Sequence, residues 1–101
     1  MVIVEGSARI GEENWDQARE VMTRMIEASR AEEGCIEYAY SRDLLDPNVL
    51  RIIERWKDLD ALVYHFSTPH MAEFRAALVG LEPKELSVRM YQAEPEPLPT
   101  S

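Results

Sequence analysis

Two side chains suited to chemistry, Trp56 and His65, stand nine residues apart in the second half of the sequence. A neutral imidazole can accept or relay a proton near pH 7, and an indole offers an aromatic ligand a flat wall. His65 lies at the edge of the apolar stripe of a short predicted helix, while Trp56 shares a strand face with Leu50 and Ile52. If that face meets the helices, both side chains border one pocket. The alternatives are a histidine bonded to a backbone carbonyl and a tryptophan that only fills the core.

Further side chains are candidates for orienting or surrounding a ligand there. Glu54 shares the face of Trp56, and a carboxylate in that position needs either a cation, for which Arg89 and Arg51 are the candidates, or a functional reason. The expected substrate-binding set is Tyr40, Glu54, Phe66, Met22, Met25, Phe74 and Arg89. The hydroxyls of Tyr38, Tyr64 and Tyr91 are further candidates for the rim of the pocket, although packing alone explains each of them.

No metal or cofactor site is predicted. The sequence contains neither GxGxxG nor GxxxxGK[ST], so a nucleotide-binding loop has no support. His65 and His70 are five residues apart with Pro69 between them, which does not place both on one helical face. His70 with Glu73 fits the i, i+3 spacing that is common on solvated helix faces, and we expect His70 to be exposed. The lone Cys35 cannot form an intramolecular disulfide and is expected to be unreactive.

The elements that must position these residues follow from periodicity and cap signals. The pattern predicts strands over 2–10, 36–41, 49–57 and 86–91, and helices that run from 15 to a stop at Gly34, over 59–66, and from 69 to a stop at Gly80. Asp58 and Thr68 are the expected caps of the two later helices. The order βαββαβ is typical of an α+β, ferredoxin-like fold with a four-stranded antiparallel sheet and helices on one face. We expect a domain over 1–94 and a proline-rich extended tail over 95–101.

Composition restricts the possible partners. The chain has 101 residues and a formal net charge of −8, which disfavours binding to nucleic acids or anionic membranes. No apolar run approaches the roughly 20 residues that span a bilayer. Residues 1–10 do not resemble a signal peptide, so we expect a cytoplasmic location. The strand over 49–57 has apolar residues on both faces, including Val49 and Ile53. Because helices can cover only one of these faces, we expect a homodimer in which a second copy covers the open face.

An ordered series of short motifs resembles the antibiotic biosynthesis monooxygenase family of dimeric α/β-barrel proteins. The series consists of residues 33–38 (EGCIEY), Asp46-Pro47, residues 54–58 (ERWKD), residues 61–65 (ALVYH), residues 67–70 (STPH) and Phe74. It covers nearly the whole chain except the tail. The positions matching the family's tryptophan and helix histidine are Trp56 and His65.

The resemblance implies a homodimer and the oxidation of a quinol or polyphenol by O2 without metal or flavin. His65 would then accept a proton, and Trp56 would pack on the substrate ring. The alternatives are a non-catalytic small-molecule-binding or stress-associated protein and a relative that handles haem or acts as an isomerase. The haem-degrading branch uses an asparagine on its first strand, and residues 2–10 contain none.

Overall fold

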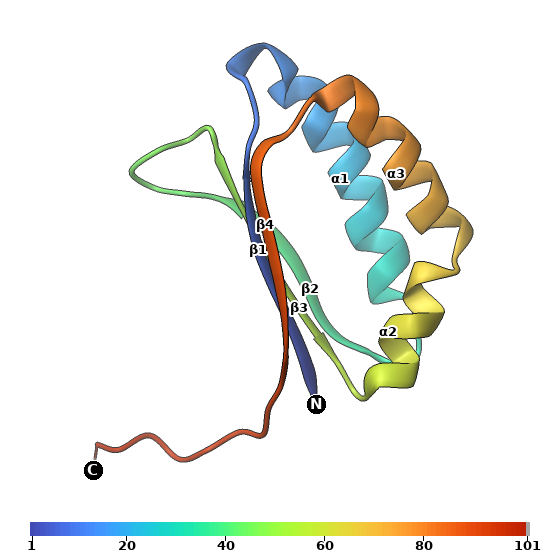
Figure 1. The fold of residues 1–101 in the computed structure, drawn as a ribbon, viewed down its shortest axis with the longest axis vertical. Helices are drawn as coiled ribbons and strands as arrows, with labels where there is room; N and C mark the ends of the chain where they lie inside the picture. Colours follow the sequence, from blue (N-terminus) through green and yellow to red (C-terminus); the bar gives the residue numbers. More distant parts are fainter. Residues whose placement is uncertain (101) are drawn as a thin grey trace.

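One antiparallel sheet and a layer of helices make up the protein, as seen in a computed structural model that describes residues 1–100 (Figure 1). The elements are β1 (Val2–Arg9), α1 (Trp15–Arg30), β2 (Cys35–Arg42), β3 (Val49–Trp56), α2 (Leu59–Phe66), α3 (Pro69–Leu81) and β4 (Lys84–Gln92). The strand order is β2-β3-β1-β4, and all neighbouring strands are antiparallel. The α+β, ferredoxin-like fold expected from the sequence is therefore confirmed.

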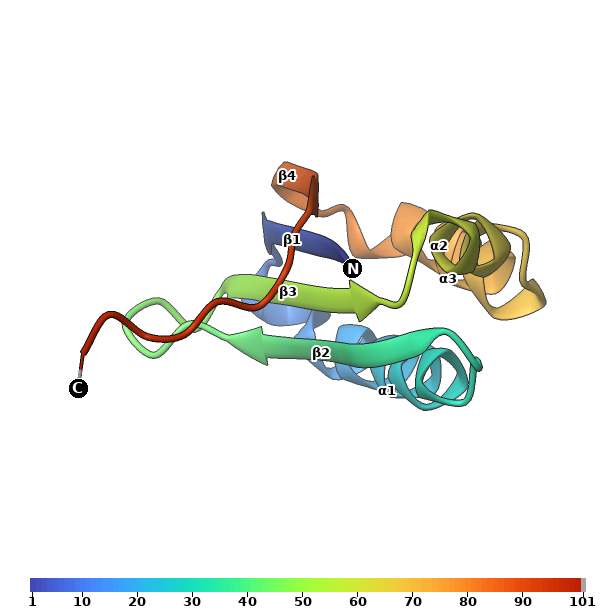
Figure 2. The ribbon, with the colours of Figure 1, turned by 90° about the horizontal axis from the view of Figure 1, so that it is seen from below.

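The helix-facing side of the sheet follows the predicted alternation. On β1 the buried residues include Val2, Val4 and Ala8, and the register pairs Val2 with Trp56 and Val4 with Glu54. These pairs place the key residues of β3 on the same face as the buried residues of β1. Figure 2 shows β4, β1, β3 and β2 following one another across the sheet.

A bulge alters the start of β2. Cys35 pairs with Trp56 and Glu37 pairs with Arg55, so Ile36 is the extra residue. An extra residue on one strand resets the alternation of side chains, and Ile36 is accordingly exposed although its hydrophobicity predicts burial. Beyond the bulge, Tyr38 and the partly buried Tyr40 face the helices as expected.

The expected caps Asp58 and Thr68 are confirmed for α2 and α3, whereas no side chain caps the start of α1. Asp58 accepts a hydrogen bond from the backbone N–H of Ala61 at 2.9 Å, and Thr68 caps α3 with Pro69 at its first turn. At the start of α1 a 3₁₀ turn, Glu12–Asn14, comes first, and the Asn14 side chain donates to the carbonyl of Leu81 instead of capping.

The predicted stop of α1 at Gly34 is wrong, because the helix ends at Arg30. The backbone of Gly34 instead passes close to α2, where a Cβ atom on this residue would overlap the methyl group of Ala61. A glycine is needed here because two main chains approach closely, and not because a helix ends.

The sheet face opposite the helices is uncovered in a single chain. All three helices lie on one side of the sheet, while the β2–β3 loop and the C-terminal segment extend toward the other side (Figure 1). Residues 95–100 form neither helix nor strand, and Ser101 lies outside the described residues, so the division at residue 94 stays a prediction. Within the described residues, the longest helices are too short or too polar to cross a membrane.

Candidate functional site

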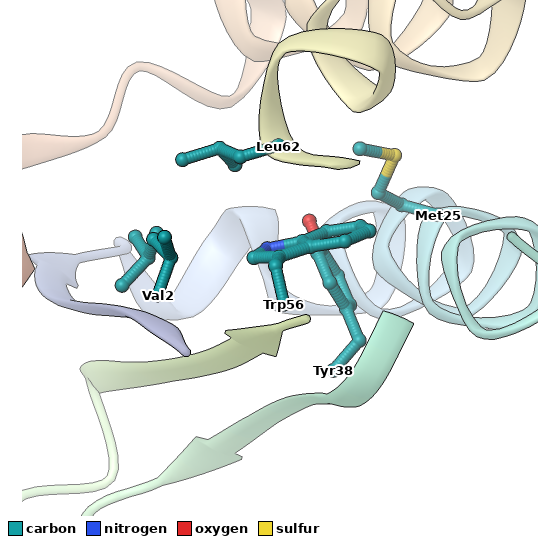
Figure 3. Close-up of a cluster of buried hydrophobic side chains, with 6 residues drawn as sticks. Val2, Met25, Tyr38, Trp56 and Leu62 are labelled. Atoms are coloured by element: carbon teal, nitrogen blue, oxygen red, sulfur yellow. The ribbon is translucent and has the colours of Figure 1, made fainter. Parts of the chain in front are cut away.

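Trp56 is completely buried at the end of β3. It packs in a core cluster with Val2, Met25, Tyr38 and Leu62, beneath helix α2 (Figure 3). Burial of an indole N–H requires a hydrogen-bond acceptor, since an unpaired polar group costs about 1–3 kcal/mol. The side chain of Glu54 supplies it, and Trp56 Nε1 donates to Glu54 Oε1 at 3.0 Å.

His65 lies above this tryptophan in α2. Only 1% of its surface is exposed. The centroid of its ring is 4.6 Å from that of Trp56 and 5.5 Å from that of Tyr38. Trp56 and His65 therefore meet between the sheet and the helices, but Trp56 does not border the cavity that His65 lines, so the expectation that both border one pocket is wrong for Trp56.

A third residue, Glu32, completes the surroundings of His65. Glu32 lies in the connection between α1 and β2, and its Oε2 atom is 2.7 Å from His65 Nδ1 and 2.6 Å from His70 Nε2. Its Oε1 atom is buried and has no hydrogen-bond partner among residues 1–100. No periodic pattern in the sequence indicates a role for Glu32, because this residue follows the end of a helix and its burial depends on the packing of the connection.

The expectation that His70 is exposed is wrong. The His70 side chain is only 22% exposed, and its ring centroid is 5.8 Å from that of His65. The two histidines belong to different helices, and the turn at Thr68 and Pro69 directs both toward Glu32. The three ligand atoms lie within 4.8 Å of one another, so this cluster is the place among the described residues where two imidazoles and a carboxylate could hold a metal ion.

A cavity of about 270 Å³ lies beside the cluster, between the sheet and the helices. Of the residues predicted from the sequence, it is lined by Met22, Tyr40, Glu54, His65, Phe66 and Phe74. Tyr38 and a set of aliphatic side chains, including Val4, Leu78, Leu86 and Val88, form the rest of the wall. The polar lining residues Tyr38, Glu54 and His65 are buried, whereas the apolar Phe66 and Val88 are about half exposed. The cavity suits a flat, mostly apolar ligand with a polar group at one end.

Three predicted residues do not line this cavity. Trp56 and Met25 are buried in the adjacent core cluster. Arg89 lies on the opposite face of the sheet, where it borders a depression together with Glu5 and Arg51. Neither arginine pairs with Glu54, so the expected cation is replaced by the indole N–H of Trp56.

Burial shapes the protonation of the polar groups around the cavity. Desolvation raises the pKa of Glu54, although the hydrogen bond from Trp56 acts in the other direction. Burial also lowers the pKa of His65, and Glu32 opposes that shift. The pKa values of Tyr38 and Tyr40 are raised mainly by burial, and their hydroxyl oxygens are 2.6 Å apart. The site thus contains a neutral imidazole and two protonated phenols at pH 7.

Cys35 contributes no activated thiol. It is partly buried at the edge of the core cluster, and burial together with the charge of Glu32 raises its pKa. A raised pKa keeps the thiol protonated at neutral pH, which agrees with the expectation that it is unreactive.

Comparison with known proteins connects this arrangement to a family. The chain is 31% identical over 91 residues to an uncharacterized protein of Synechocystis sp., covering 90% of this chain and 62% of that protein. It is 27% identical over 99 residues to a protein of Escherichia coli named as a probable quinol monooxygenase, covering 90% and 94% of the two chains.

Solved structures share the whole fold. A Deinococcus radiodurans protein, described as a candidate antibiotic biosynthesis monooxygenase, superposes with a TM-score of 0.90 at 29% identity over 100% of both chains. A conserved protein from Methanosarcina mazei superposes with a TM-score of 0.84 at 28% identity over 92% of both chains. The sequence profile named antibiotic biosynthesis monooxygenase matches residues 1–77. The chain therefore belongs to the antibiotic biosynthesis monooxygenase family.

Proposed function

We propose that the protein is a monooxygenase that oxidises a small quinol or polyphenol with O2. The observation that carries this proposal is the apolar cavity of about 270 Å³ with a buried histidine in its wall. This volume lies just below the usual range of roughly 300–1,000 Å³ for drug-sized ligands and suits a small ligand of one or two fused aromatic rings. Relatives named as quinol monooxygenases provide independent support for the same class of substrate.

His65 is the proton acceptor in this proposal. A ring hydroxyl of the substrate gives its proton to His65, and the resulting phenolate is electron-rich enough to reduce O2. A bond forms between a ring carbon and one oxygen atom, and His65 returns the proton to the distal oxygen of the peroxide. The O–O bond then breaks as the C–H hydrogen of that carbon is lost. One oxygen atom remains as a quinone carbonyl, and the other combines with that hydrogen and leaves as water.

The other polar groups at the buried end would orient the substrate. Tyr38 and Tyr40 remain protonated because burial raises the pKa of both, so their hydroxyls can donate to an oxygen of the substrate. Glu54 lines the cavity and is held by Trp56. In this arrangement Trp56 supports Glu54 and His65 from behind, instead of packing directly on the substrate ring.

The test is the aerobic consumption of dihydroxynaphthalenes and hydroquinones, with anaerobic incubation as the control. We expect protein-dependent turnover that requires O2, and one atom of ¹⁸O from ¹⁸O2 in the quinone product. A His65→Asn variant should lose about 100-fold or more in kcat, because amides cannot act as bases near pH 7. If the protein binds these compounds but none is consumed faster with it than without it, the chain is a binding protein and the proposal fails.

We also propose that the chain forms a homodimer through the open sheet face. Val49 and Ile53 place apolar side chains on this face, which the helices of the same chain do not cover. An Ile53→Lys variant would bury a charge at such an interface and should be monomeric by light scattering at micromolar concentration. Val79→Lys on α3, in the helix layer on the other side of the sheet, is the matched control and should stay dimeric. A wild-type mass of one protomer would refute the dimer.

A further inference from the structure

The side chain of Glu32 forms two short hydrogen bonds that the proposed reaction does not use. One oxygen, Oε2, lies 2.7 Å from His65 Nδ1 and 2.6 Å from His70 Nε2. A carboxylate oxygen can only accept, so an ionised Glu32 requires a proton on each of these nitrogen atoms. The contacts therefore select one neutral tautomer for each histidine.

For His65 the selected tautomer is the one that leaves Nε2 unprotonated. Nε2 makes no hydrogen bond with any residue from 1 to 100, and His65 lines the cavity. A neutral imidazole that donates from Nδ1 is a proton acceptor at Nε2. Without an acceptor for Nδ1–H, either nitrogen could carry the proton and the base would be present only part of the time.

The distances favour a hydrogen-bonded cluster over a metal site. Two nitrogen or oxygen ligands of a tetrahedral zinc ion with bonds of 2.0–2.1 Å are about 3.3 Å apart. The observed separations of 2.7 and 2.6 Å from Glu32 to the two imidazoles are those of charge-assisted hydrogen bonds. The burial of the carboxylate strengthens both bonds, because only 6% of the Glu32 side chain is exposed.

We propose that Glu32 is a positioning residue that holds His65 in the Nδ1–H tautomer and so makes Nε2 the base that faces the cavity. His70 anchors the same carboxylate from α3, so that Glu32 is fixed from two sides. The part of this inference that concerns catalysis rests on the proposed monooxygenase function. The part that concerns the tautomer does not.

The charged and titratable groups around His65 come from several elements. Besides Glu32, they are His70 and Arg75 on α3, Glu54 on β3 and Tyr38 on β2. His70 and Arg75 disfavour the imidazolium form, whereas Glu32 favours it. Removing Glu32 should therefore lower the pKa of His65 further.

The experiment is nitrogen NMR of the full chain labelled with ¹⁵N-histidine, which gives simple spectra because the sequence has only two histidines. At pH 8 we expect His65 in the Nδ1–H tautomer and His70 in the Nε2–H tautomer. In Glu32→Ala, His65 should shift toward the Nε2–H tautomer, and its pKa should fall. Glu33→Ala changes the neighbouring, exposed carboxylate and is the matched control, which should leave both signals unchanged. An Nε2–H tautomer of His65 in the wild type would overturn the inference.

Activity and metal binding provide two further readouts. In Glu32→Ala, kcat should fall about 10- to 100-fold with little change in KM, and Glu32→Asp should restore part of the loss. Stoichiometric, tight binding of Zn²⁺ that disappears in Glu32→Ala and His70→Asn would overturn the inference in favour of a metal site. If no quinol is consumed but the tautomer still depends on Glu32, the proposed function fails and the positioning role of Glu32 stands.

Discussion

The indole of Trp56 contacts both His65 and Glu54, two polar side chains in the wall of the cavity. Its ring centroid lies 4.6 Å from that of His65, and its N–H donates to Glu54 at 3.0 Å. A completely buried side chain with no surface in the cavity thus determines the position of two groups that do line it. The stability and the chemistry of the site are linked through this residue.

Replacing Trp56 with Phe should lower the free energy of unfolding by more than the lost packing alone. The change removes the N–H donor and leaves a buried carboxyl group without its partner, which costs about 1–3 kcal/mol. Urea denaturation measures the loss. In a Glu54→Leu background the same substitution should cost less, since no carboxyl group is left unpaired. Equal losses in the two backgrounds would show that the hydrogen bond contributes nothing.

The free energy of unfolding should fall as the pH decreases from about 7 to 5.5, and His65 should account for part of this slope. Burial lowers the pKa of His65 below its ordinary value of 6.5, so the unfolded chain binds this proton more readily than the folded chain. The contribution of His65 to the free energy of unfolding is complete above pH 6.5 and is lost as the pH falls toward the pKa of His65 in the folded protein. His65→Asn should flatten the slope, whereas Tyr64→Asn, at an exposed position of the same helix, should not.

Glu54→Gln should stabilise the protein increasingly as the pH rises. Burial raises the pKa of Glu54 above its ordinary value of 4.5, so its contribution to stability is present at low pH and is lost as the pH rises through the folded pKa. Glutamine does not titrate and can still accept from Trp56. Denaturation at pH 4 and pH 8 measures the difference. A difference between the two proteins that does not change with pH would contradict the buried-carboxyl explanation.

Val88→Trp should close the cavity without unfolding the protein. Val88 lines the cavity and is 54% exposed, so a larger side chain can extend over the mouth without overpacking the core. We expect KM for the proposed quinol substrate to rise at least tenfold, with a melting temperature close to that of the wild type. Val79→Trp adds the same side chain at an exposed position of α3 outside the cavity wall. If both variants raise KM equally, the mouth does not lie at β4.

Periodicity and cap signals predict most of the fold because each depends on neighbours in the sequence. The alternation on β3 and the stripe on α2 were sufficient to bring Trp56 and His65 together. The same alternation on β4 places Arg89 on the other face of the sheet from Val88, and therefore outside the cavity. Glu32 was not predictable in this way, because its contacts depend on an irregular connection and on the turn between α2 and α3.

The contact between Glu32 and His65 depends on the glycine at position 34. The glycine lies two residues from Glu32, and any side chain at this position would overlap Ala61, four residues before His65. Because Gly34 has no Cβ atom, the connection that carries Glu32 can approach closely the helix that carries His65. An alanine there would require the two segments to move apart, and such a shift would lengthen the 2.7 Å hydrogen bond between Glu32 and His65.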